Sequence, residues 1–206
     1  RPHHRFLHSF PTRRSSDLSC GLADDDRAEK NKYVYVTFFD KTFERFCLEN
    51  YDLNGDGRLS RYEAQRVREM SCPGLGIASL SDLESFTSLE RLDCSRNDLT
   101  ELDLRPCTLL KRIDCSGNRI ARLDVEDLRA LVQLNAADNY LTQTDLTSNG
   151  SLAELDLRRN RLQTLDVASC AATLRADVRE NPELATVYCR SGQGVTFDGI
   201  TRLVER

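Results

Sequence analysis

The chain has 206 residues, of which 39% are hydrophobic and 30% charged, and its formal net charge is -4. This composition is too apolar for a disordered chain and is typical of a globular protein. No run of about 18 apolar residues is present, so a membrane-spanning helix is not expected. The slightly acidic charge and the lack of a Lys/Arg run argue against nucleic-acid binding.

Residues 1–18 do not look like natural protein. The stretch 8–18 resembles a common high-throughput sequencing adapter read in one frame and translated, and the segment is neither periodic nor apolar. We interpret 1–18 as a sequencing artefact, with an ordinary basic tail as the alternative, and leave it out of the fold.

Residues 19–32 resemble the start of a mature bacterial lipoprotein. Cys20 follows a small residue and precedes an acidic run at positions 24–26. In such proteins acyl chains on the cysteine hold the chain at a bilayer, while a charged tether keeps it extended. The apolar segment expected before the cysteine is absent, so a chance cysteine is the alternative. The resemblance implies a lipid-anchored protein of the bacterial outer membrane or cell surface; a secreted or periplasmic protein is the alternative.

A calcium-binding loop is predicted at residues 52–63, which match the twelve-residue EF-hand loop at every diagnostic position. A hard cation needs oxygen ligands on alternate residues of a tight turn, and Gly57 permits the sharp bend. Leu59 has the apolar character of the position that anchors such a loop. The predicted ligands are the side chains of Asp52, Asn54, Asp56, Ser60 and Glu63 and the backbone carbonyl of Arg58.

Both flanks of this loop have helical patterns. Residues 42–50 carry apolar positions at helical spacing, and Asp40 is the expected N-cap. After the loop, Ser60 and Glu63 form the pattern of a capping box for a helix over residues 61–70. The sequence therefore predicts an EF-hand-like helix-loop-helix cap over residues 33–70.

Only one such loop is visible, whereas regulatory EF-hands usually occur in pairs. A single site with three carboxylates suits the weak extracellular class of calcium site, with dissociation constants of about 10⁻⁴ to 10⁻³ M. We therefore expect Ca²⁺ as a structural clip and not as the signal of a sensor. The cap running into repeats also resembles an arrangement in bacterial surface repeat proteins, where the helical module covers the exposed core of the first repeat.

From residue 89 the sequence repeats with a period of 21. The motif LxxLxCxxNxLxxLxL places asparagines at Asn97, Asn118, Asn139, Asn160 and Asn181. This pattern resembles the bacterial leucine-rich-repeat family. The expected fold is an α/β-type repeat solenoid over residues 71–190, with short parallel strands and inward leucines that supply stability only when the turns stack. Each asparagine is expected to satisfy backbone groups where the chain leaves a strand.

The cysteines follow the same scheme. Cys94 and Cys115 occupy one inward position in adjacent turns, Cys72 precedes them in a degenerate turn, and Ala136, Leu157 and Val178 continue the column. We interpret them as small buried hydrophobes. Disulfides between turns are the alternative, whereas zinc is not expected without a Cys-x-x-Cys pair or a nearby histidine.

The outward side chains of the predicted strands form a surface that we call the ladder face. Its columns are Arg91, Arg112, Gln133, Glu154 and Arg175; Asp93, Asp114, Asn135, Asp156 and Asp177; and Ser95, Ser116, Ala137, Arg158 and Arg179. A charged ligand-binding face and a solvated face with balanced charges are both compatible with this pattern. A second column, Asp103, Asp124, Asp145 and Asp166, is interpreted as turn chemistry in which each Asp bonds local amides.

Residues 191–206 are expected to form a C-terminal cap, with a turn at 191–194 and a closing segment over 195–204. The leading functional hypothesis is a monomeric, non-catalytic cell-surface module that binds another protein or a surface glycan. A structural spacer or surface-layer component is the alternative. An enzyme is not expected, because His3, His4 and His8 are the only histidines and no Gly-rich phosphate loop is visible.

Overall fold

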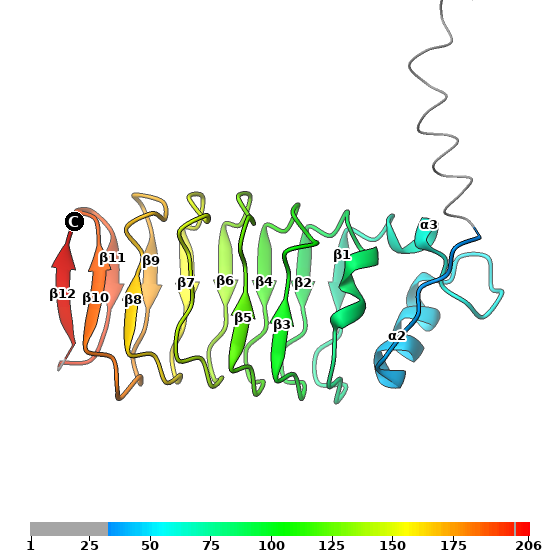
Figure 1. The fold of residues 1–206 in the computed structure, drawn as a ribbon, viewed down its shortest axis with the longest axis horizontal. Helices are drawn as coiled ribbons and strands as arrows, with labels where there is room; N and C mark the ends of the chain where they lie inside the picture. The colour runs from blue at the N-terminus through cyan, green and yellow to red at the C-terminus, as the bar shows by residue number, and fades with distance from the viewer. Residues whose placement is uncertain (1–32, 200) are drawn as a thin grey trace, which may run out of the picture.

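The structure is a computed structural model that describes residues 33–199 and 201–206. A helical segment lies at one end of a row of short strands, and the C-terminus lies at the other end (Figure 1). The elements are α2 (Lys41–Tyr51), α3 (Arg61–Ala64), β1 (Glu69–Ser71), a 3-10 helix (Ser81–Ser85), β2 (Arg91–Asp93), β3 (Glu101–Asp103), β4 (Arg112–Asp114), β5 (Arg122–Asp124), β6 (Gln133–Asn135), β7 (Glu154–Asp156), β8 (Thr164–Asp166), β9 (Arg175–Asp177), β10 (Thr186–Cys189), β11 (Gly194–Thr196) and β12 (Arg202–Glu205).

One wall of the solenoid is a parallel sheet of seven strands in the order β1-β2-β4-β6-β7-β9-β11. From β2 to β9 its register advances by one repeat per strand, so that Leu92 pairs with Ile113 and Ile113 with Leu134. In each of these strands the middle side chain is buried and the two flanking side chains point away from the core. The period-2 alternation read from the sequence is thereby confirmed, and with it the parallel solenoid of 21-residue turns.

The asparagine column ties each turn to the next. In the turn of Asn139, the side-chain Nδ2 donates to the carbonyls of Cys115, Ala136 and Ala137, and Oδ1 accepts the amide of Ile120 at 2.9 Å. Asn118, Asn160 and Asn181 repeat the pattern in their own turns. All five asparagines are buried, which confirms their expected role in satisfying backbone groups.

The opposite wall is divided into two smaller parallel sheets, β3-β5 and β12-β10-β8. The break falls at residues 142–146, which lie between β5 and β8 without forming a strand. Here Thr144 stands where neighbouring turns have Leu123 and Leu165, and its buried hydroxyl has no hydrogen-bond partner among the described residues. An open groove of about 810 Å³ lies over this break.

The cysteine column is part of the apolar core. Cys72, Cys94 and Cys115 are at most 1% exposed, as are Leu157 and Val178 further along the column. All seven cysteines of the described chain are free thiols. Burial raises the pKa of the Cys72 and Cys115 thiols to about 12, so both stay protonated at neutral pH. Their description as small buried hydrophobes is confirmed.

The helix α2 covers the first turn of the solenoid. Asp40 caps it through the amides of Thr42 and Phe43, as predicted. Phe43 is fully buried, and its ring centroid lies 6.1 Å from that of Phe86, just after the 3-10 helix. The other Asp40 oxygen accepts the amides of Ala78 and Ser79, so one carboxylate joins the helix start to the first turn.

The structure corrects the predicted length of the second helix. A helix was expected over residues 61–70, but α3 ends at Ala64 and β1 begins at Glu69. Met70 takes the inward position of the first strand, opposite Leu92, and is 2% exposed. Because Met70 can close the edge of the seven-stranded sheet only from a strand, tertiary packing overrides the local helical pattern.

The C-terminal segment continues the solenoid path. A closing segment is predicted over residues 195–204, and in this region β11 extends the seven-stranded sheet and β12 the three-stranded sheet. Gly194 pairs with Arg175, so this last turn is shorter than the regular period. Leu203, paired with Val187, is 40% exposed, which shows that this end of the core is partly open.

Candidate functional site

The loop between α2 and α3 is organised by its own polar side chains. The two Asp52 oxygens accept the amides of Gly55 and Gly57, each at 2.8 Å. Asn54 Oδ1 accepts the amide of Asp56, and Asp56 Oδ1 accepts that of Arg58. Gly57 has φ +78°, a conformation that side chains with a Cβ adopt rarely. These bonds hold Asp52, Asn54 and Asp56 within one tight turn.

Glu63 reaches back into this turn from the short helix α3. Its Oε1 accepts the amides of Leu53 and Asn54, and its Oε2 accepts the amide and the hydroxyl of Ser60. The Ser60 hydroxyl accepts the Glu63 amide in return, which confirms the predicted capping box. Glu63 is 4% exposed, so a buried carboxylate links the two ends of the loop.

A segment before α2 pairs with the second half of the loop. Val36 N donates to Leu59 O at 2.8 Å, and Arg61 N donates to Val34 O at 2.7 Å, giving an antiparallel bridge between Tyr35 and Ser60. The Arg58 guanidinium carbon lies 3.6 Å from the centroid of the Tyr35 ring. Leu59 is 1% exposed, which confirms its predicted role as the anchor of the loop.

The donor set of the loop suits a calcium ion in its chemistry. It holds three carboxylates, one amide oxygen, one hydroxyl and the carbonyl of Arg58, all hard oxygen ligands. Among residues 33–199 and 201–206, however, no group of three or more His, Cys, Asp or Glu side chains is close enough together to hold a metal. Glu63 is instead held by four protein donors, which a bound cation would have to replace in part.

The amino-terminal half of the ladder face carries carboxylates bound by neutral donors. Asp93 accepts the amide and hydroxyl of Ser95, at 3.1 and 2.7 Å. Asp114 does the same with Ser116, and its second oxygen accepts the Asn135 amide group at 3.0 Å. Neither aspartate has an ion-pair partner within the described part of the chain.

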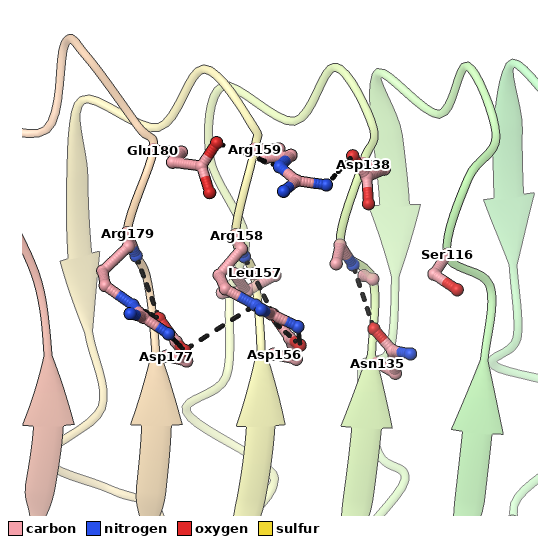
Figure 2. A network of polar contacts seen from close by, with 12 residues as sticks. Ser116, Asn135, Asp138, Asp156, Leu157, Arg158, Arg159, Asp177, Arg179 and Glu180 are labelled. Atoms are coloured by element: carbon pink, nitrogen blue, oxygen red, sulfur yellow. Dashed lines mark hydrogen bonds and ion pairs between the residues drawn. The ribbon is translucent and has the colours of Figure 1, made fainter.

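In the carboxyl-terminal half of the ladder face, the aspartates are neutralised by arginines of the same face (Figure 2). Arg158 binds Asp156 at 2.6 Å and reaches Asp177 at 3.7 Å, while Arg179 binds Asp177 at 2.6 Å. The hydrogen bond from Arg179 is the largest contribution that holds the pKa of Asp177 below its ordinary value. Between the two halves, β6 contributes only the neutral Gln133 and Asn135 to this face.

The first column of the ladder face is less fully paired. Arg91 forms an ion pair with Glu69 at 3.0 Å. Arg112, Glu154 and Arg175 form no ion pair among the residues that the structure describes, although strand pairing sets Glu154 beside Arg175. All the predicted ladder residues therefore share one face in register, but only part of their charge is compensated internally.

Two features of these sites were missed from the sequence, and the predictions for residues 1–18 and 19–32 lie outside the described residues. The pairing of residues 34–36 with the loop was not anticipated, although the β-branched and aromatic run at 33–37 is typical of a strand. The second bond of Asp40, to the first turn, was also missed, because it joins residues 38 positions apart. Cys20, the predicted lipidation site, lies outside the described residues.

The second aspartate column is turn chemistry, as predicted. Asp103, Asp124, Asp145 and Asp166 each accept the amide two residues further on. Arg105 additionally forms ion pairs with Asp103 and Asp124, and Arg206 with Asp166. This column therefore stabilises the turns of the wall opposite the ladder face.

The fold and the asparagine column define a leucine-rich-repeat solenoid. Solved structures similar to it are internalin-like proteins of bacteria. The functional domain of InlJ from Listeria monocytogenes, which includes a cysteine ladder, shares 27% identity at a TM-score of 0.56 over 65% of this chain and 32% of that one. The internalin InlF of the same organism shares 16% identity at a TM-score of 0.56 over 82% of this chain and 55% of that one.

This chain thus spans about a third of the InlJ domain and about half of InlF. No protein-family model matches the sequence, and no curated protein matches it. Within the described residues, neither helix has the length and apolar character needed to cross a bilayer.

Proposed function

We propose that this chain is a non-catalytic protein-interaction module of the bacterial cell surface, which binds its partner through the amino-terminal half of the ladder face. The fold supports this proposal, because stacked repeats present a long continuous surface and because the similar solved structures are internalin-like. Anchoring through a lipid on Cys20 belongs to the same proposal and rests on the sequence around that residue.

The uncompensated charges of Arg112, Asp93 and Asp114 are the observation on which the binding surface rests. On the carboxyl-terminal half, Arg158 and Arg179 neutralise the aspartates, and those arginines would have to give up ion pairs to contact a partner. Arg112 is exposed, and within the described part of the chain it has no ion pair to give up. Charges without an internal partner can complement a partner's charges and raise the rate of association.

The test uses charge reversal on opposite walls of the solenoid. Arg112→Glu should reduce the association rate with a captured surface protein by about tenfold. Arg122→Glu, on β5 of the opposite wall, is the matched control and should leave it unchanged. Surface plasmon resonance measures both rates. Equal loss from both variants would contradict the ladder face as the binding surface, and a chain that captures no partner would favour the spacer function.

A structural calcium site in an EF-hand-like cap is the second part of the proposal. Asp52, Asn54, Asp56, Ser60 and Glu63 would hold the ion with their side chains, and Arg58 with its carbonyl. Bound Ca²⁺ would supply positive charge to a loop with three carboxylates and so favour its closed turn. The hard-oxygen donor set, the sharp bend at Gly57 and the buried position of Glu63 support this assignment.

A further inference from the structure

Residues 34–36 form a strand-like segment that pairs with the loop from outside it. Val36 N and Val34 O bond to Leu59 O and Arg61 N, the backbone groups on either side of Ser60. Both distances, 2.8 and 2.7 Å, are those of strong backbone hydrogen bonds. The peptide units before and after Ser60 are therefore fixed from outside the loop.

The loop is held in two parts by different means. The turn with Asp52, Asn54 and Asp56 is held by hydrogen bonds within itself. The part with Arg58 and Ser60 leads into α3, where the capping box joins Ser60 to Glu63. Its backbone groups Leu59 O and Arg61 N bond to the segment 34–36. The Tyr35 ring also covers the Arg58 guanidinium, 3.6 Å from its centroid, and so holds that side chain on the outer side of the loop.

We propose that residues 34–36 are a positioning segment for the calcium site, taking in cis the place of the second loop with which a regulatory EF-hand usually pairs. This inference rests on the proposed calcium site. The segment fixes the peptide units on either side of Ser60 and, through the Tyr35 ring, the side chain of Arg58. The ion therefore does not bear the entropic cost of fixing this part of the loop.

The segment also connects the loop to the repeats. It leads directly to Phe39, whose amide donates to the buried carboxylate of Asp82, and to Asp40, which binds the first turn. The exposed side chain of Val34 makes no contribution to this chain of contacts, because only its carbonyl bonds to the loop. Val34 therefore offers a control variant within the same segment.

The experiment measures the Kd for Ca²⁺ alone by isothermal titration calorimetry on the full chain, at a temperature at which every variant is folded. Tyr35→Ala should weaken binding about threefold, because it removes the ring over Arg58. Val36→Pro should weaken it about tenfold, because it removes the donor to Leu59. Tyr35→Phe, which keeps the ring, and Val34→Ala, which keeps the carbonyl, should bind within about twofold of the unsubstituted chain.

The outcomes separate the inference from the site on which it rests. If the unsubstituted chain binds no Ca²⁺, the calcium site itself is wrong. If the unsubstituted chain binds Ca²⁺, and if Tyr35→Ala and Val36→Pro bind it with the same Kd, the calcium site stands and the positioning role of residues 34–36 is overturned. Melting curves in chelator show whether a variant has lost its fold. A purely structural role would lower those melting temperatures and leave the Kd unchanged.

Discussion

Each turn of the solenoid depends on one asparagine side chain. A side-chain amide is needed because the position must donate to several backbone carbonyls and also accept a backbone N–H. A carboxylate cannot donate, and a leucine can neither donate nor accept. The 21-residue spacing was enough to predict which asparagines do this. It could not predict their partners, such as the Ile120 amide that Asn139 accepts, because these come from the preceding turn.

Replacing one of these asparagines should destabilise the whole solenoid. Asn139→Ala leaves the buried Ile120 amide without its acceptor, at a cost of about 1–3 kcal/mol. It also takes one of two donors from each of three carbonyls, those of Cys115, Ala136 and Ala137, at about 0.5–1.5 kcal/mol for each bond lost. We expect a loss of about 3 kcal/mol or more in urea unfolding. Asn50→Ala, at an exposed position of α2, is the control and should cost under about 1 kcal/mol.

The carboxylate of Asp40 makes stability depend on pH. Partial burial alone would raise its pKa, but the amides of Phe43, Ala78, Ser79 and Thr42 together lower it below the ordinary 3.8. A lowered pKa contributes stability above about pH 4, and this is lost as the pH falls through the folded-state value. Asp82 acts in the opposite sense, since burial raises its pKa, and its contribution is lost as the pH rises.

Asp40→Asn should therefore cost more at neutral than at acidic pH. The amide can still cap α2, but its NH2 group cannot accept the amides of Ala78 and Ser79. We expect a loss of about 1–2 kcal/mol in urea unfolding at pH 6 and a smaller loss at pH 3. Glu49→Gln, exposed on the same helix, should change neither value. A penalty for Asp40→Asn that is equal at both pH values would contradict the role of its charge.

At the scale of elements, the wall opposite the ladder face contains one defect. The leucine column of this wall is interrupted at Thr144, and the sheet is interrupted at the same place. A threonine suits a strand as well as a leucine does, so local propensity does not explain the break. The loss of an apolar side chain between Leu123 and Leu165, together with a buried hydroxyl that has no partner among the described residues, accounts for the interruption of the sheet.

Thr144→Leu should repair this column and stabilise the chain. It removes the unpartnered hydroxyl and restores apolar burial, for an expected gain of about 1–2 kcal/mol. That gain should raise the melting temperature by about 3–6 °C. Thr142→Leu is the matched control, because residue 142 is exposed, and should leave it unchanged. A lower melting temperature for Thr144→Leu would mean that the site has no room for leucine.

The sequence predicted the repeated elements better than the single ones. Five turns repeat one motif, so a turn whose own sequence is ambiguous can be assigned by aligning it with the other turns. The cap has no such redundancy. Its second helix was predicted too long, because residues 65–70 have a helical pattern although Met70 is needed in β1. The segment 34–36 is too short for periodicity to identify, and only its contacts with Leu59 and Arg61 define it.

At the scale of the whole molecule, the cap should couple calcium to the stability of the solenoid. With a dissociation constant of about 10⁻⁴ M, millimolar Ca²⁺ would stabilise the fold by about 1.4 kcal/mol. We expect the melting temperature in calcium to exceed that in chelator by about 3–6 °C. Asp52→Ala should abolish the difference and Glu49→Gln should preserve it. Differential scanning calorimetry measures the melting temperature of each variant in calcium and in chelator. If the unsubstituted chain melts at the same temperature in both, the structural calcium site is contradicted.

The asparagine column also bears on how such a chain can lengthen. A segment of 21 residues contains one asparagine, the carbonyls of its own turn that it holds, and an amide that the next asparagine must accept. A tandem duplication of such a segment therefore adds each hydrogen-bond donor of the asparagine column together with its acceptor, and leaves no buried polar group without a partner. The first turn differs by one residue, since Met70 pairs with Leu92, and Asn97 still binds the carbonyl of Cys72 there. Gene duplication in whole turns is thus a change that this architecture tolerates.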